Sequence, residues 1–67
     1  MTGEIKHLVG DRGFGFIEDA DGLEYFFHAR DLVAGSGSFG SLYRGQRAWF
    51  EPVATDRGRA AVRVEVR

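Results

Sequence analysis

Apolar and polar residues alternate along most of the chain in short runs, each of which ends at a turn-forming segment. The runs cover Glu4–Val9, Phe14–Glu18, Leu23–His28, Gln46–Val53 and Ala60–Val66. Alternation with a period of two is typical of β-strands that are buried on one face. No run carries a sustained apolar period of 3.6 residues, and only residues 28–33 leave room for a single helical or 3₁₀ turn. The pattern therefore predicts an all-β chain of five short strands.

The segments between the runs contain the residues that tight turns require. Gly10-Asp11 follows the first run, Asp21-Gly22 follows the second, and Asp56-Arg57-Gly58 precedes the last. Asp-Gly pairs are strong hairpin signals, so the second and third runs should lie side by side. Residues 34–40 are rich in glycine and serine and are expected to form a loop. Five short strands in so small a chain must curl to protect their edges, which favours a closed or nearly closed β-barrel.

The alternation also assigns side chains to the two faces of the predicted sheet. Phe14, Phe16, Phe26 and His28 fall on one face of the second and third strands. The opposite face, together with apolar residues of the other segments, is expected to fill the barrel. This predicted interior consists of Ile5, Ile17, Tyr25, Phe27, Leu32, Leu42, Ala48, Phe50, Val62, Val64 and Val66.

The aromatic residues are concentrated in one part of the chain, since five of the nine lie within residues 14–27. Aromatic side chains are more often buried than functional, so one alternative is that both faces belong to the core. A small barrel has only one interior, however, and the other apolar residues already compete for it. Lys6, Arg12 and His28 surround the face that carries Phe14, Phe16 and Phe26. An aromatic surface edged by cations suits single-stranded nucleic acid, because bases stack on rings and cations follow phosphates.

Net charge and cysteine content limit the classes of function. Nine Lys and Arg against ten Asp and Glu give a formal net charge of −1, so an anionic polymer would have to bind at a local patch. The absence of cysteine excludes disulfides and thiolate zinc sites and is typical of a reducing compartment. The start, Met1 to Glu4, has no basic region and leads into no long apolar run, so no membrane segment is expected. A cytoplasmic location is predicted.

Catalytic and metal-binding chemistry find no support in the sequence. His7 and His28 have no cysteine and no carboxylate partner at metal-ligand spacing, so we expect neither a metal ion nor a cofactor. Asp19 and Asp21 flank a turn and are interpreted as solvated. No nucleophile can be paired with a base, and the chain is not expected to be an enzyme.

Four motifs give the chain a resemblance to a known family. G-E-I-K-H-L is similar to a first strand of the form G-x-V-K-W-F, and R-G-F-G-F-I to K-G-F-G-F-I. Y-F-F-H-A is similar to V-F-V-H-F, and F-G-S-L-Y-R-G-Q to F-x-x-L-x-x-G-Q. From Gly3 to about Val64 the chain thus resembles a cold-shock domain. The resemblance implies one domain over residues 1–67, folded as a small five-stranded antiparallel OB-fold β-barrel. It also implies binding of single-stranded RNA or DNA, with RNA-chaperone or antiterminator-like action.

Carried over position by position, the resemblance implies a set of nucleic-acid contacts. They come from Lys6, Arg12, Phe14, Phe16, Phe26, His28, Phe39 and Arg57, with His7 as a further, weaker stacking ring. Phe39 would be a loop aromatic that closes over a base. The three cations near phosphates predict a log–log salt slope of about 2. His7 replaces the family's Trp, while Leu8 and Ala29 replace Phe, so affinity should be roughly tenfold to a few hundredfold below that of a typical member.

Trp49 fits neither the core nor the aromatic face. Alternation points Ala48 and Phe50 inward and Trp49 outward, on a strand that carries none of the binding motifs. Trp49 is either covered by the long loop or by Tyr43, or it forms a contact surface for another protein or a second copy, since tryptophan is enriched in interface hot spots. The alternative function is therefore a protein-interaction module on a cold-shock-like barrel with weakened nucleic-acid binding.

Overall fold

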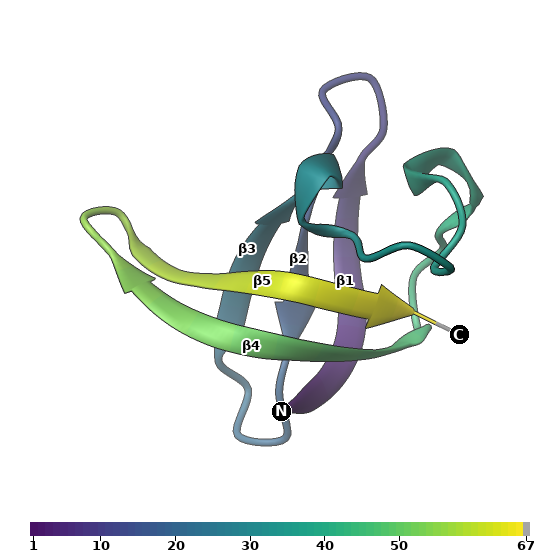
Figure 1. The fold of residues 1–67 in the computed structure, drawn as a ribbon. Coiled ribbons are helices and arrows are strands. Elements are labelled where there is room, and N and C mark those ends of the chain that lie inside the picture. Colours follow the sequence, from purple (N-terminus) through teal and green to yellow (C-terminus); the bar gives the residue numbers. More distant parts are fainter. Residues whose placement is uncertain (67) are drawn as a thin grey trace.

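The computed structural model describes residues 1–66, which form five strands and two short 3₁₀ helices (Figure 1). The strands are β1 (Thr2–Val9), β2 (Phe14–Glu18), β3 (Glu24–His28), β4 (Arg47–Thr55) and β5 (Gly58–Val66). The 3₁₀ helices η1 (Ala29–Asp31) and η2 (Phe39–Ser41) lie between β3 and β4. The five predicted strands are confirmed, with ends that differ by two residues at most. No helix within residues 1–66 is long and apolar enough to span a membrane.

The strands close a barrel in the order β1-β2-β3-β5-β4, which confirms the predicted five-stranded barrel. β1 pairs antiparallel with β2 and β4, β2 with β3, and β4 with β5. The expectation of a wholly antiparallel barrel is wrong at one seam, where β3 and β5 run parallel and pair at Phe26 and Ala60. A closed ring with an odd number of strands cannot alternate direction throughout, so one neighbouring pair has to be parallel. In Figure 1 the long β4–β5 hairpin lies across the β1–β2–β3 sheet, with its turn beyond β3.

The interior is filled by side chains from all five strands and from the loop before β4. Most of the predicted core is confirmed, and Leu32 packs against the core while remaining partly exposed. The prediction is wrong for Val62, which is only partly buried, and it missed the fully buried Ala61. The buried apolar residues are Ile5, Ile17, Tyr25, Phe27, Leu42, Ala48, Phe50, Ala61, Val64 and Val66.

Two irregularities in strand pairing explain where the alternation fails. Between the pairs Trp49–Glu65 and Glu51–Val62, one residue of β4 faces two of β5, so the inward face of β5 shifts by one position. Arg63 at this point adopts a φ of 51°, in the left-handed region. A β-bulge of this kind bends a strand and redirects its side chains. Beyond the bulge, Ala61 rather than Val62 faces the core.

Candidate nucleic-acid interface

Three phenylalanine rings form a contiguous group on the outer face of β2 and β3. The ring centroids lie 5.4 Å apart for Phe14 and Phe26, 5.8 Å for Phe16 and Phe26, and 6.2 Å for Phe14 and Phe16. The hairpin register produces this grouping, since Phe16 pairs with Phe26 and Phe14 pairs with His28. Phe26 is 37% exposed, which is unusual for a side chain of its size. The predicted outward aromatic face is confirmed, and we call these three rings the platform.

His7 extends the platform onto β1. Its ring lies 6.4 Å from that of Phe16, in an edge-on arrangement with an interplanar angle of 88°. Strict alternation would send His7 into the barrel with Ile5, but the pairing of β1 with β2 shifts between these two residues. Lys6 and His7 are therefore both exposed, and Leu8 instead packs against the core. Only the family motif pointed to His7, because the bulge is not visible in the alternation.

His28 lies at the end of β3, where the start of η1 holds its ring in one orientation. Its Nδ1 accepts a hydrogen bond of 3.1 Å from the backbone N–H of Arg30. Its own backbone N–H donates to Oδ2 of Asp31 at 2.9 Å, which completes a capping box. Since Nδ1 acts as the acceptor, the proton of the neutral ring resides on Nε2. His28 can therefore donate a hydrogen bond from Nε2 to a ligand beside Phe14.

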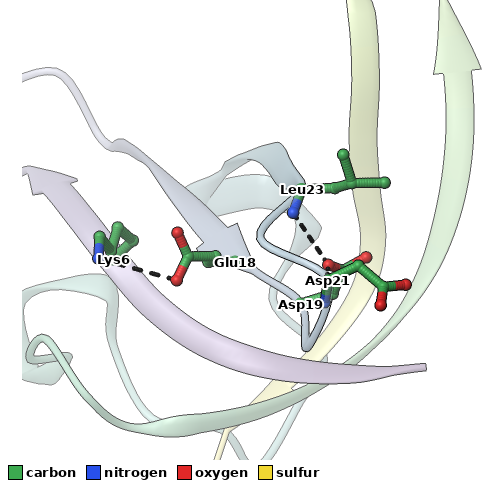
Figure 2. Close-up of polar contacts among 5 residues, drawn as sticks. All are labelled: Lys6, Glu18, Asp19, Asp21 and Leu23. Carbon is green, nitrogen blue, oxygen red and sulfur yellow. Dashed lines mark hydrogen bonds and ion pairs between the residues drawn. The ribbon is translucent and has the colours of Figure 1, made fainter.

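The three predicted cations differ in how free they are to contact phosphate. Lys6 Nζ lies 3.7 Å from Oε1 of Glu18, on the neighbouring strand (Figure 2). Arg12 is exposed in the turn between β1 and β2. Arg57 is exposed in the turn between β4 and β5 and lines a surface groove together with Phe16 and Phe26. Arg12 and Arg57 are thus better placed for a ligand than Lys6, which already has a carboxylate partner.

A groove of about 710 Å³ runs along the parallel seam and shares Phe16 and Phe26 with the platform. We call it the seam groove. Arg30 of η1, Arg57 of the β4–β5 turn and Arg59 of β5 all line it. Of these three arginines the sequence motifs marked only Arg57, because Arg30 and Arg59 belong to segments that only the folded chain brings together. The high share of arginine among the cations, eight of nine, was the one available signal.

Phe39 lies at the core rather than at the platform. It begins η2, and its ring lies 5.9 Å from that of Phe27, a residue of zero exposure. Its side chain is partly buried against the core cluster. The structure thus brings together His7, Phe14, Phe16, Phe26 and His28, and it leaves Phe39 apart from them. That Phe39 closes over a base stays a prediction.

Trp49 lies on β4, where it pairs with Thr2 of β1 and Glu65 of β5. It is 38% exposed, as its outward assignment predicted. β4 carries none of the three platform rings, and Thr2 lies at the opposite end of β1 from His7, so Trp49 belongs to a different surface. A protein partner or a second copy at this surface stays a prediction.

A buried carboxylate anchors the turn that joins β2 to β3. Asp19 is only 8% exposed, so its interpretation as a solvated residue is wrong. Its Oδ1 accepts hydrogen bonds from the backbone N–H of Leu23 at 3.0 Å (Figure 2) and from that of Asp21 at 2.9 Å. Its Oδ2 accepts one of 2.9 Å from the hydroxyl of Tyr25. A turn carboxylate that satisfies three donors ties the hairpin to the core through Tyr25.

The same contacts change the pKa values of both groups. Burial would raise the pKa of Asp19, but the hydrogen bonds from Leu23, Tyr25 and Asp21, together with the charge of Arg59, lower it on balance. Burial and the hydrogen bond to Asp19 raise the pKa of Tyr25. The Asp19 carboxylate is therefore the favoured form in the folded chain, and Tyr25 keeps its proton to donate.

We expect the barrel to lose stability on acidification partly through Asp19. A group whose pKa is lowered by folding stabilises the fold fully above its ordinary pKa of 3.8, and this stabilisation is lost as the pH falls toward the lowered value. Thermal unfolding followed by circular dichroism between pH 6 and about pH 3 should show a steeper fall in Tm for the natural chain than for Asp19→Asn. Asp21→Asn, with its side chain exposed in the same turn, is the matched control and should retain the steep fall. Equal slopes for all three proteins would place the acid sensitivity elsewhere.

Comparison with known proteins gives a consistent result along the whole chain. Residues 1–67 match the family model described as the 'Cold-shock' DNA-binding domain. The cold shock-like protein CspD of Bacillus cereus is 41% identical over 64 residues, which cover 96% of this chain and 94% of that protein. The cold shock-like protein CspC of Escherichia coli K12 is 39% identical over 64 residues, with coverage of 96% and 91%. Cold shock protein 1 of Lactiplantibacillus plantarum is 34% identical over 63 residues, with coverage of 94% and 92%.

Proposed function

The chain belongs to the cold-shock domain family of nucleic-acid-binding domains, and from this we propose that it binds single-stranded RNA or DNA by base stacking. The observation that supports this most directly is the platform, whose rings lie 5.4 to 6.2 Å apart on the outer face of β2 and β3. Stacking of a base on an aromatic side chain contributes about 1–3 kcal/mol. Three such contacts amount to about 3–9 kcal/mol of favourable, sequence-tolerant interaction, without any enclosed pocket.

The proposed mechanism separates stacking from charge. Unpaired bases lie on Phe14, Phe16 and Phe26, and His7 adds an edge-on ring beside Phe16. His28 donates a hydrogen bond from Nε2 to a base oxygen or a phosphate. Arg12 and Arg57 lie near phosphates, whereas Lys6 contributes less because it forms an ion pair with Glu18. A duplex is excluded because its bases are already stacked and present only their edges.

In a cell the protein would act through this binding as an RNA chaperone or antiterminator, without nucleotide hydrolysis. Each base-pair step of a duplex contributes about 1.4 kcal/mol on average, whereas the platform offers about 3–9 kcal/mol for three unpaired bases. Occupying unpaired bases can therefore keep a few steps open but cannot melt a long helix. The proposed activity is the removal of weak RNA structure.

The test is a titration of fluorescein-labelled dT and dC heptamers with the purified protein, read by fluorescence anisotropy. The label belongs on the oligonucleotide because Trp49 lies on another surface and need not report on binding at the platform. We expect both single strands to bind and a blunt-ended duplex of the same composition to leave the anisotropy unchanged. No binding of single strands at about tens of micromolar folded protein would contradict the proposal and shift attention to the surface around Trp49.

A further inference from the structure

The arginines of this chain are not spread evenly over its surface. Three of the eight, Arg30, Arg57 and Arg59, line the seam groove, although they come from η1, from the β4–β5 turn and from β5. The formal net charge of the chain is −1, so this concentration of positive charge does not follow from overall composition. Within a groove, charges of one sign raise the local potential more than the same charges spread over a convex surface.

In the described part of the chain the groove arginines are not held by ion pairs, although Arg59 contacts the ring of Tyr25 and its charge also acts on Asp19. Two ion pairs lie outside the groove, between Lys6 and Glu18 at 3.7 Å and between Arg63 and Glu51 at 4.0 Å. Within residues 1–66, none of the three groove arginines forms an ion pair. Arg59 lies over the ring of Tyr25, with 5.9 Å between its guanidinium carbon and the ring centroid.

Two carboxylates also line the groove, and they oppose its charge only in part. Asp31 already accepts a hydrogen bond from the backbone of His28 through Oδ2. Glu24 is exposed at the start of β3. Three guanidinium groups against two carboxylates leave a formal lining charge of +1, in a chain whose total is −1.

Position links this groove to the platform. Phe16 and Phe26 belong to both, so a base stacked on either ring would lie beside the groove. Val53 and Val62 add an apolar lining that sugars can cover. The bulge in β5 contributes directly, because it turns Val62 outward and Ala61 inward.

We propose that the seam groove binds phosphodiester groups of the strand that stacks on the platform, through Arg30, Arg57 and Arg59. The inference rests on the proposed function and deepens it, because it moves the centre of the charged contacts from Lys6 to the parallel seam. Guanidinium groups suit this role, since their planar fork matches two phosphate oxygens at once. The bound strand then runs from the platform across β3 toward the β4–β5 hairpin.

Salt dependence tests the proposal, because each phosphate contact with a single strand adds about 0.7 to the log–log slope of affinity against salt. The variant Arg30→Gln, Arg57→Gln, Arg59→Gln should lower the slope for the dT heptamer by about 2. It should also weaken binding about tenfold to a hundredfold at low salt. The matched control, Arg44→Gln, Arg47→Gln, Arg63→Gln, removes the same charge from exposed positions outside the groove and should change the slope by less than about 0.7.

The outcomes separate this inference from the proposed function. If the natural chain binds no single strand, the proposed function fails and the inference falls with it. If the natural chain binds and the two triple variants lose the same slope, the groove assignment alone is overturned. Because Arg59 packs over Tyr25, a thermal melt checks the fold. If the triple variant does not fold, Arg30→Gln, Arg57→Gln decides the matter, with an expected loss in slope of about 1.4.

The oligonucleotide ends distinguish internal phosphates from terminal ones. Heptamers with and without a 5′-phosphate or a 3′-phosphate are compared on the natural chain and on the groove variant. Equal losses for all of them support internal phosphodiesters as the ligand. A loss confined to the terminally phosphorylated strands would make the groove an end-binding site and would overturn the assignment to phosphodiesters.

Discussion

Replacing Phe14 and Phe26 together with alanine is expected to remove single-strand binding while the barrel remains folded. The two rings lie 5.4 Å apart at the centre of the platform, and each contacts Phe16 as well. Losing two stacking contacts at about 1–3 kcal/mol each weakens binding by about 30-fold to more than 10,000-fold. Both side chains lie on the outer face of the sheet, so their truncation leaves the buried core unchanged.

The measurement is the anisotropy titration with the dT heptamer, accompanied by thermal melts of each variant. Tyr43→Ala serves as the matched control, because Tyr43 is an aromatic residue with 63% exposure that lies outside the platform. Its removal should change the Kd by less than about threefold. An unchanged Kd in the double variant would show that the platform is not the binding surface. An equal loss in Tyr43→Ala would show that aromatic content, rather than this face, carries the binding.

Gly15→Ala is expected to destabilise the barrel by about 3 kcal/mol, the upper end of the range for overpacked interiors. A Cβ at Gly15 would lie 2.5 Å from the backbone oxygen of His7, 3.0 Å from the ring of Phe27 and 3.1 Å from Leu8 Cδ2. The carbonyl of His7 belongs to the strand paired with β2 and cannot move away without opening the β1–β2 ladder. For a domain of this size, 3 kcal/mol is about a third or more of the total stability.

Gly10→Ala provides the matched control for this substitution. No atom lies within 4 Å of the position that its Cβ would occupy, and its φ is outside the left-handed region. Urea unfolding followed by circular dichroism should leave its free energy of unfolding within about 0.5 kcal/mol of the natural value. The Gly15 variant should also bind single strands less tightly, because Phe14 and Phe16 flank the strained position. Equal urea midpoints for the two variants would contradict the prediction, because they would mean that β1 and β2 can move apart at Gly15 without a loss of stability.

The platform was predictable because its geometry is local. Phe14, Phe16 and Phe26 lie on two strands joined by one short hairpin, and the Asp21-Gly22 turn places those strands side by side. Alternation then decides which side chains share a face. The same reasoning failed at Val62 and gave no indication that His7 faces outward, because bulges in β5 and β1 shift the alternation by one residue. These bulges depend on how the whole barrel closes, and the pattern within a single strand does not contain that information.

The positions of the charged side chains relative to one another could not be predicted from the sequence. Lys6 satisfied the family pattern as a phosphate contact, yet the fold places Glu18 of the neighbouring strand beside it. Arg30 and Arg59 had no motif to mark them, yet the seam puts both beside Arg57. From its sequence context Asp19 was expected to be a solvated turn residue. In the folded chain it is buried and accepts a hydrogen bond from Tyr25.

By itself the sequence determined the number of strands and their positions along the chain, the outward aromatic face and the family. These properties depend on side-chain periodicity, turn chemistry and short motifs, which act between residues close together in the chain. The tertiary structure alone decided the parallel seam, the seam groove with its arginines, the pairing of Lys6 with Glu18, and the position of Phe39 at the core. Each of these arises when the five-stranded ring closes and brings residues of distant segments into contact, with directions and distances that local rules do not encode.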